Sequence, residues 1–73
     1  MSKNTKVNAA ILSIGNEILS GRTQDTNTLT LATWLNSLGV KVEEVRVIPD
    51  LEKTIIDTLN LLRADYDYVF TTG

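Results

Sequence analysis

The chain has 73 residues, of which 42% are hydrophobic and 22% are charged, and its formal net charge is −2. These proportions are typical of a small globular domain and argue against a disordered or fibrous sequence. The seven Lys and Arg residues are scattered along the chain, which argues against the basic surface of a nucleic-acid-binding protein.

Cysteine and histidine are both absent from the sequence. Disulfides, the usual zinc ligands, thiol nucleophiles and a serine–histidine–acid triad are therefore excluded. Carboxylates, hydroxyls, amides and backbone N–H groups remain, and these suit phosphate and hard-metal chemistry. The polar residues 1–6 lack the apolar core of a signal peptide, and no apolar stretch reaches membrane-spanning length. We expect a disordered tail at 1–6 and a cytoplasmic protein without a membrane or nucleic-acid partner.

The first predicted strand, residues 7–14, is almost continuously apolar. Such a strand is buried on both faces, which is typical of a parallel sheet in an α/β protein. A polar loop bracketed by Gly15 and Gly21 follows it directly. Because ligands of α/β proteins bind beyond the carboxyl ends of the strands, this loop is the first candidate site. Its glycine spacing is one residue longer than in the nucleotide P-loop, and Arg22 stands where that motif has lysine.

The polar residues of this loop suggest how it could contact a ligand. Ser20 can present a hydrogen-bond donor, while Asn16 and Glu17 could orient an amide- or hydroxyl-bearing group. The alternative is a loop in which glycine serves backbone geometry only, with Ile18 and Leu19 as a hydrophobic plug. The residue types leave both interpretations open.

A first helix is predicted from Thr26 or Asn27, ended by Gly39 in a left-handed conformation. Asp25, Thr26 or Asn27 can cap its N-terminus. Its apolar stripe has helical spacing and consists of Leu31, Trp34, Leu35 and Leu38. We expect Trp34 to pack in the core or in an interface.

The second predicted strand, residues 40–48, is interrupted by Glu43 and Glu44, which suggests an edge strand. Asp50 is expected to cap the second helix. The apolar stripe of that helix is Leu51, Ile55, Leu59 and Leu62, widened by Ile56. The third predicted strand, residues 66–71, leads into Thr72 and Gly73. The Glu43–Glu44 and Asp65–Asp67 pairs are interpreted as solvated charges.

The order of these elements, β-α-β-α-β, predicts a parallel three-stranded sheet. Two strand orders compete: 3-2-1, with both helices on one face, and 2-1-3, with the helices on opposite faces. Because the first strand is apolar and the second carries glutamates, we prefer 2-1-3. This order creates a switch point between the first and third strands, where a ligand crevice is expected. The third strand would leave an uncovered edge, which natural domains avoid, so we expect a fragment of a longer protein.

Five separated segments carry a family resemblance: residues 14–21, 25–27, 35–39, 47–50 and 69–73. In order and spacing they resemble the start of the molybdopterin-binding (MoaB/Mog-like) domain family, nearest the N-terminal domain of competence-damage-inducible protein A (CinA). The resemblance implies that residues 7–73 are the N-terminal portion of a doubly wound three-layer α/β domain, truncated at Gly73.

The resemblance also implies a set of ligand-binding residues. These are Gly15, Asn16, Glu17, Ser20, Gly21, Asp25, Asn27, Thr72 and Gly73. Glu17 is the candidate for organising a metal, and in the family Gly73 would open a glycine-rich, acid-bearing stretch. The main acidic groups would lie in that stretch, so the 73 residues alone are expected to be inactive.

The function implied is pterin or nucleotide binding, with molybdopterin, or Mg²⁺ or another divalent metal with a nucleotide, as the cofactor. One alternative is a metal-dependent ADP-ribose pyrophosphatase, and family members that adenylylate molybdopterin define a related activity. A second alternative is a non-catalytic oligomerisation domain. A homo-oligomer, such as a trimer, is the expected assembly.

Overall fold

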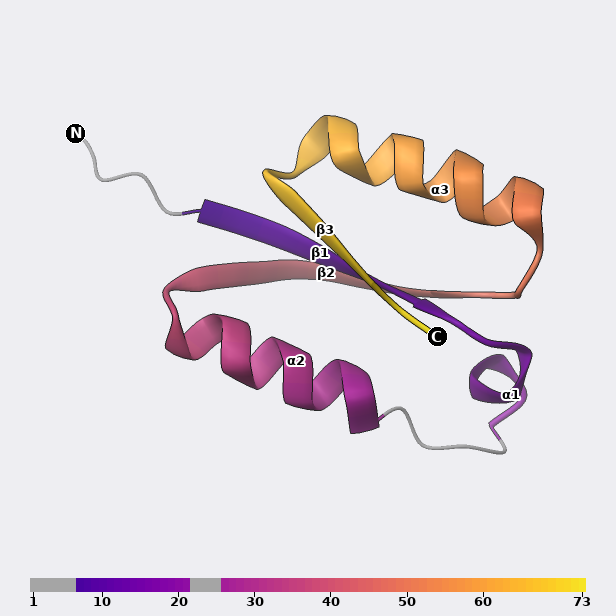
Figure 1. Cartoon of the computed structure of the whole chain (residues 1–73), viewed down its shortest axis with the longest axis horizontal. Coiled ribbons are helices and arrows are strands. Elements are labelled where there is room, and N and C mark those ends of the chain that lie inside the picture. The colour runs from indigo at the N-terminus through magenta and orange to yellow at the C-terminus, as the bar shows by residue number, and fades with distance from the viewer. Residues whose placement is uncertain (1–6, 22–25) are drawn as a thin grey trace.

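The computed structural model describes residues 7–21 and 26–73, which form a three-stranded sheet with helices on both faces (Figure 1). In chain order the elements are β1 (Val7–Ile14), α1 (Asn16–Leu19), α2 (Thr26–Ser37), β2 (Val40–Ile48), α3 (Glu52–Asp65) and β3 (Tyr68–Thr72). The predicted tail at 1–6 lies outside the described residues.

The strand order is β2-β1-β3, and both pairings are parallel. This confirms the predicted order 2-1-3 and excludes 3-2-1. Figure 1 shows α3 on one side of the sheet and α2 on the other. β1 is central, and residues 9–13 of it are buried. The physical reason is that only a strand covered on both faces can be apolar at successive positions without exposing half of its side chains.

The face of the sheet under α3 holds the main apolar cluster. Its buried members are Ala10, Leu12, Ile48 and Leu62, and partly buried Ile14, Ile55, Leu59, Tyr66 and Val69 pack against them. The predicted stripe of the second helix is therefore confirmed in its centre. Leu51 and Ile56 are exposed, so the stripe is narrower than expected.

The opposite face of the sheet is covered by α2, whose Leu35 is almost fully buried. Gly39 has φ +86° and ends the helical segment in the left-handed conformation that was predicted. Trp34, however, is 56% exposed and does not enter the core. Because Thr28 and Leu35 define the inward direction of α2, Trp34 lies on a flank of the helix.

The prediction that Asp50 caps the second helix, α3, is wrong. Leu51 is the N-cap residue, it makes no side-chain capping bond, and the helix begins at Glu52. The backbone N–H of Asp50 donates to Asn16 Oδ1 at 3.2 Å, and Leu51 N–H donates to the Pro49 carbonyl at 2.9 Å. The turn made at Pro49 thus places Asp50 one residue too early to cap α3.

The third strand begins at Tyr68, two positions later than predicted, because Tyr66 still belongs to the end of α3. The Tyr66 N–H donates to the Leu62 carbonyl at 3.0 Å. Asp67 and Asn8 exchange two hydrogen bonds: Asp67 N–H donates to Asn8 Oδ1 at 2.9 Å, and Asn8 N–H donates to Asp67 Oδ2 at 3.1 Å. Asp67 is therefore more than a solvated charge, since it fixes the start of β3 beside β1.

Candidate functional site

The carboxyl ends of the three strands lie at the same end of the sheet because all pairings are parallel. Three segments meet there: the turn of α1 after β1, the connection from β2 to α3, and the residue that follows β3. Figure 1 shows α1 beyond the end of β1, on the side where β2 turns towards α3. This arrangement is the candidate ligand site.

Gly15 is buried where β1 leaves the sheet, and its N–H donates to the Ile48 carbonyl at 3.0 Å. Its φ of 167° is extended backbone that any residue can adopt, so its conformation does not require glycine. A Cβ at this position would lie 2.7 Å from Glu17 Oε1, an atom at the far end of an exposed side chain that can move aside. The carboxylate of Glu17 therefore folds back over the glycine, at the end of the central strand.

Asn16 connects two of the three segments. Its Oδ1 accepts the N–H of Asp50, which joins the turn after β1 to the connection after β2. That bond does not use the side-chain NH₂ group, which remains a donor that a ligand could engage. It also brings Asp50, which sequence reasoning treated mainly as a helix cap, to the border of the site. The sequence did carry one sign of this location, because Asp50 follows closely on the carboxyl end of a predicted strand.

The rest of the loop is wound into one helical turn, α1. Ser20 Oγ donates to the Glu17 carbonyl at 3.0 Å, and Ser20 N–H donates to the Asn16 carbonyl at 3.0 Å. Gly21 has φ +78°, a conformation that favours glycine. Of the two residues in the alternative hydrophobic plug, Ile18 is half-buried and Leu19 is exposed. Ser20 and Gly21 thus have defined local roles in shaping the turn that presents Glu17.

Gly73 lies directly against the end of β1. A Cβ at Gly73 would lie 3.1 Å from the Ile14 carbonyl oxygen and 3.4 Å from Ile14 Cβ. Thr72 precedes it and pairs in register with Ser13. The structure therefore brings Thr72 and Gly73 to the end of β1, directly before the Gly15 turn. This is the switch point between β1 and β3, where the strand order led us to expect a ligand crevice.

Two predicted site residues, Asp25 and Asn27, remain, and the structure describes only Asn27. Asn27 is exposed in the first turn of α2. Asp25, and Arg22 of the predicted loop, lie outside the described residues. Within 7–21 and 26–73, no three acidic side chains gather in a group that could hold a metal ion. No helix in this described part has the length and hydropathy needed to cross a membrane.

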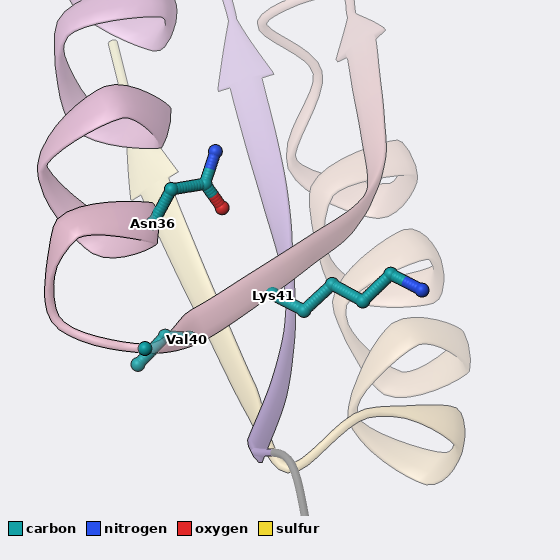
Figure 2. A pocket seen from close by; sticks show the side chains of 4 residues that line it. Asn36, Val40 and Lys41 are labelled. Carbon is teal, nitrogen blue, oxygen red and sulfur yellow. The ribbon is translucent and has the colours of Figure 1, made fainter.

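A shallow hollow of about 240 Å³ lies away from the candidate site, between the end of α2 and the start of β2. Asn36, Gly39, Val40 and Lys41 line it. Figure 2 shows the Asn36 side chain directed from α2 towards the strands, while Lys41 extends away from α2. Because it lies at the amino end of β2, the hollow is separated from the three segments described above by the length of the sheet.

Comparison with known proteins gives a family and a fold. Residues 10–73 match a family described as a probable molybdopterin binding domain. A probable FAD synthase from Caenorhabditis elegans is 45% identical over 65 residues, covering 89% of this chain and 12% of that protein. A CinA-like protein from Flavobacterium psychrophilum is 40% identical over 65 residues, covering 89% of this chain and 16% of that protein.

The fold is shared with a crystal structure of CinA from Thermoplasma acidophilum. The TM-score is 0.88 at 30% sequence identity, over 94% of this chain and 41% of that chain. This chain spans only 25% and 12% of the length of two of the curated relatives that it matches.

Proposed function

Because this chain belongs to the molybdopterin-binding domain family, with CinA-like proteins among its relatives, we propose that it provides part of a binding site for a pterin or a nucleotide. The ligand lies at the carboxyl ends of β1 and β3. The observation that supports this proposal is the close approach of Gly73 to Ile14, because it brings the residue that follows β3 against the end of β1, directly before the Gly15 turn.

The polar groups at this end of the sheet fit a pterin or a purine base. Each of these rings presents N–H donors next to acceptor atoms along one edge. The Glu17 carboxylate accepts hydrogen bonds only, and the Asn16 NH₂ group donates them, so the two side chains together match such an edge. The chemistry that molybdopterin supplies when bound is metal coordination through its own sulfur atoms. The residues of this chain bind and orient the ring.

The comparisons support a nucleotide as well as a pterin. The C. elegans relative is named as a probable synthase of FAD, which contains an adenine nucleotide. Asp50, held at the border of the site by Asn16, adds an exposed carboxylate on the β2 side. Carboxylate oxygens are the ligands that Mg²⁺ prefers, and a metal-bound nucleotide would place its phosphates on this side.

The experiment is a calorimetric titration of the full-length protein with neopterin, with ADP-ribose, and with ADP-ribose plus Mg²⁺. We expect one of these probes to bind, and the Glu17→Gln variant to bind it about tenfold more weakly. The melting temperature should be unchanged, since Glu17 is exposed. Glu43→Gln, which changes an exposed glutamate on β2, is the control and should bind like the unmodified chain.

Each other outcome has a definite meaning. Cleavage of ADP-ribose to AMP in the presence of metal would identify a pyrophosphatase rather than a binding domain. Loss of folding in Glu17→Gln would show that the turn is structural. Absence of binding for all three probes in a full-length protein that self-associates would leave the oligomerisation domain as the function.

A further inference from the structure

The hydrogen bonds that join β1 to β2 continue beyond the ends of the two strands. Ile14 pairs with Ile48 at the end of the parallel ladder, and the Gly15 N–H still donates to the Ile48 carbonyl at 3.0 Å. In a regular parallel ladder, the residue that makes this donation also accepts, through its own carbonyl, the N–H two positions beyond Ile48. The next bond of the ladder would therefore join the Asp50 N–H to the Gly15 carbonyl.

The Gly15 carbonyl makes a different bond, because the chain turns at Gly15 into α1. This carbonyl accepts the Leu19 N–H at 3.4 Å, which is a bond of the helical turn. The Asp50 N–H donates instead to Asn16 Oδ1 at 3.2 Å. The side chain of Asn16 thus takes the place of a backbone carbonyl and extends the ladder by one bond beyond the end of β1.

Asn16 is attached both to α1 and to the connection that follows β2. Its backbone carbonyl accepts the Ser20 N–H at 3.0 Å, so its main chain belongs to the α1 turn, while its side chain holds the Asp50 N–H. In the β2 connection, the Leu51 N–H donates to the Pro49 carbonyl at 2.9 Å. That local bond closes the turn at residues 49–51, whereas the bond to Asn16 fixes where this turn lies relative to α1.

We propose that Asn16 is a positioning residue for the ligand site: its Oδ1 holds residues 49–51 against the α1 turn and so keeps Asp50 at the border of the site. The inference rests on the proposed function, because it assigns a role within that site. Asn16 and Asp50 are both exposed, so their bond lies at the surface that an approaching ligand would meet. Loss of the bond frees one wall of the site from the other.

The two polar atoms of the Asn16 amide have different roles in this proposal. The oxygen acts through Asp50, and the NH₂ group is the part that a ligand could engage directly. An aspartate at position 16 retains an acceptor oxygen but has no NH₂ group, whereas an alanine has neither. The substitutions Asn16→Asp and Asn16→Ala therefore separate positioning from direct contact with the ligand.

Amide hydrogen exchange of the full-length protein, followed by NMR, tests the positioning role without a ligand. In Asn16→Ala we expect the Asp50 amide to exchange about fivefold faster, which is the effect of losing one ordinary hydrogen bond. Asn16→Asp should leave this rate unchanged. Asn60→Asp adds the same charge at an exposed position of α3 and is the matched control, also with an unchanged rate. An Asp50 amide that exchanges equally fast in Asn16→Ala and in the unmodified protein would overturn the proposal.

Calorimetric titration of the same proteins gives the second readout, with whichever of neopterin, ADP-ribose or ADP-ribose plus Mg²⁺ binds the unmodified protein. High salt screens the charge that aspartate adds. Asn16→Ala should bind the probe about fivefold more weakly than Asn16→Asp, because only aspartate restores the bond to Asp50. Equal weakening by the two variants would show that Asn16 acts through its NH₂ group alone and would overturn the positioning role. Absence of binding by the unmodified protein would contradict the proposed function instead, and the exchange rate of the Asp50 amide then decides whether Asn16 holds the turn.

Discussion

Glu44 illustrates how a residue that looks like a solvated charge acquires a structural role. The Arg46 Nε–H donates to Glu44 Oε2, and the Tyr66 hydroxyl donates to Glu44 Oε1 at 2.8 Å. The bond from Arg46 lies within β2, whereas the bond from Tyr66 links β2 to the end of α3 across 22 residues. The Arg46 hydrogen bond, followed by that from Tyr66, lowers the pKa of the Glu44 carboxyl, while the bond to Glu44 raises the pKa of Tyr66.

These pKa shifts predict how the stability of the chain depends on pH. A carboxyl whose pKa is lowered on folding stabilises the folded state above its unfolded pKa, which is near the ordinary value of 4.5. That contribution is lost as the pH falls below 4.5 through the lower folded pKa. Tyr66→Phe removes one of the two bonds that lower the pKa, so its stability should fall less steeply with acid than that of the unmodified chain. Urea denaturation from pH 7 down to pH 3 checks this, and parallel curves would contradict it.

At the scale of elements, α3 is attached to the sheet by a few side chains of one stripe. Leu62 is only 1% exposed and belongs to the main apolar cluster, whereas its neighbour Leu61 is 52% exposed. The two leucines have the same size and the same helix propensity, so they differ only in direction around the helix axis.

Leu62→Ala should therefore destabilise the chain by about 3 kcal/mol, because a buried leucine loses both its transfer free energy and its packing contacts. Leu61→Ala should cost less than about 0.5 kcal/mol, as is usual for exposed positions. Thermal unfolding followed by circular dichroism measures both. Since a chain of this size is only marginally stable, the first variant is expected to be largely unfolded at room temperature. Equal effects of the two substitutions would show that α3 does not pack on the sheet through Leu62.

For the molecule as a whole, the order β2-β1-β3 makes β1 the only strand paired on both sides among the described strands. Its central residues, Ala9 to Ser13, are also almost completely buried. The stability of the fold is therefore concentrated in one strand, and the polar turn that follows this strand is the part from which the candidate site is built.

Amide hydrogen exchange tests this distribution. At low protein concentration we expect the amides of residues 9–13 to exchange most slowly, because they open only with the whole sheet. The outward amides of β3 should exchange faster, because no strand of the described residues pairs with that side of β3. Slowest exchange in β2 or β3 at low concentration would be inconsistent with a central β1.

Elements marked by a local sequence pattern were predicted correctly, whereas features that depend on contacts between distant residues were not. β1 was predicted with its correct bounds because continuous apolar sequence has few interpretations, and Gly39 marked the end of the first helical segment because few residues adopt φ +86°. The cap of α3 and the start of β3 were predicted wrongly. Both depend on partners distant in sequence, namely Asn16 for Asp50 and Asn8 for Asp67.

The sequence by itself determined the class of fold and the family and favoured the strand order 2-1-3, since polarity, motif spacing and the positions of glycine and proline are local properties of the chain. Only the tertiary structure decided which groups are neighbours: the Glu17 carboxylate over Gly15, Asp50 against Asn16, and Gly73 against Ile14. It also decided that Trp34 lies on the surface rather than in the core. The physical reason is that hydrophobic patterning specifies which faces are buried, whereas hydrogen-bond partners and exposed flanks are set by how separate segments meet in space.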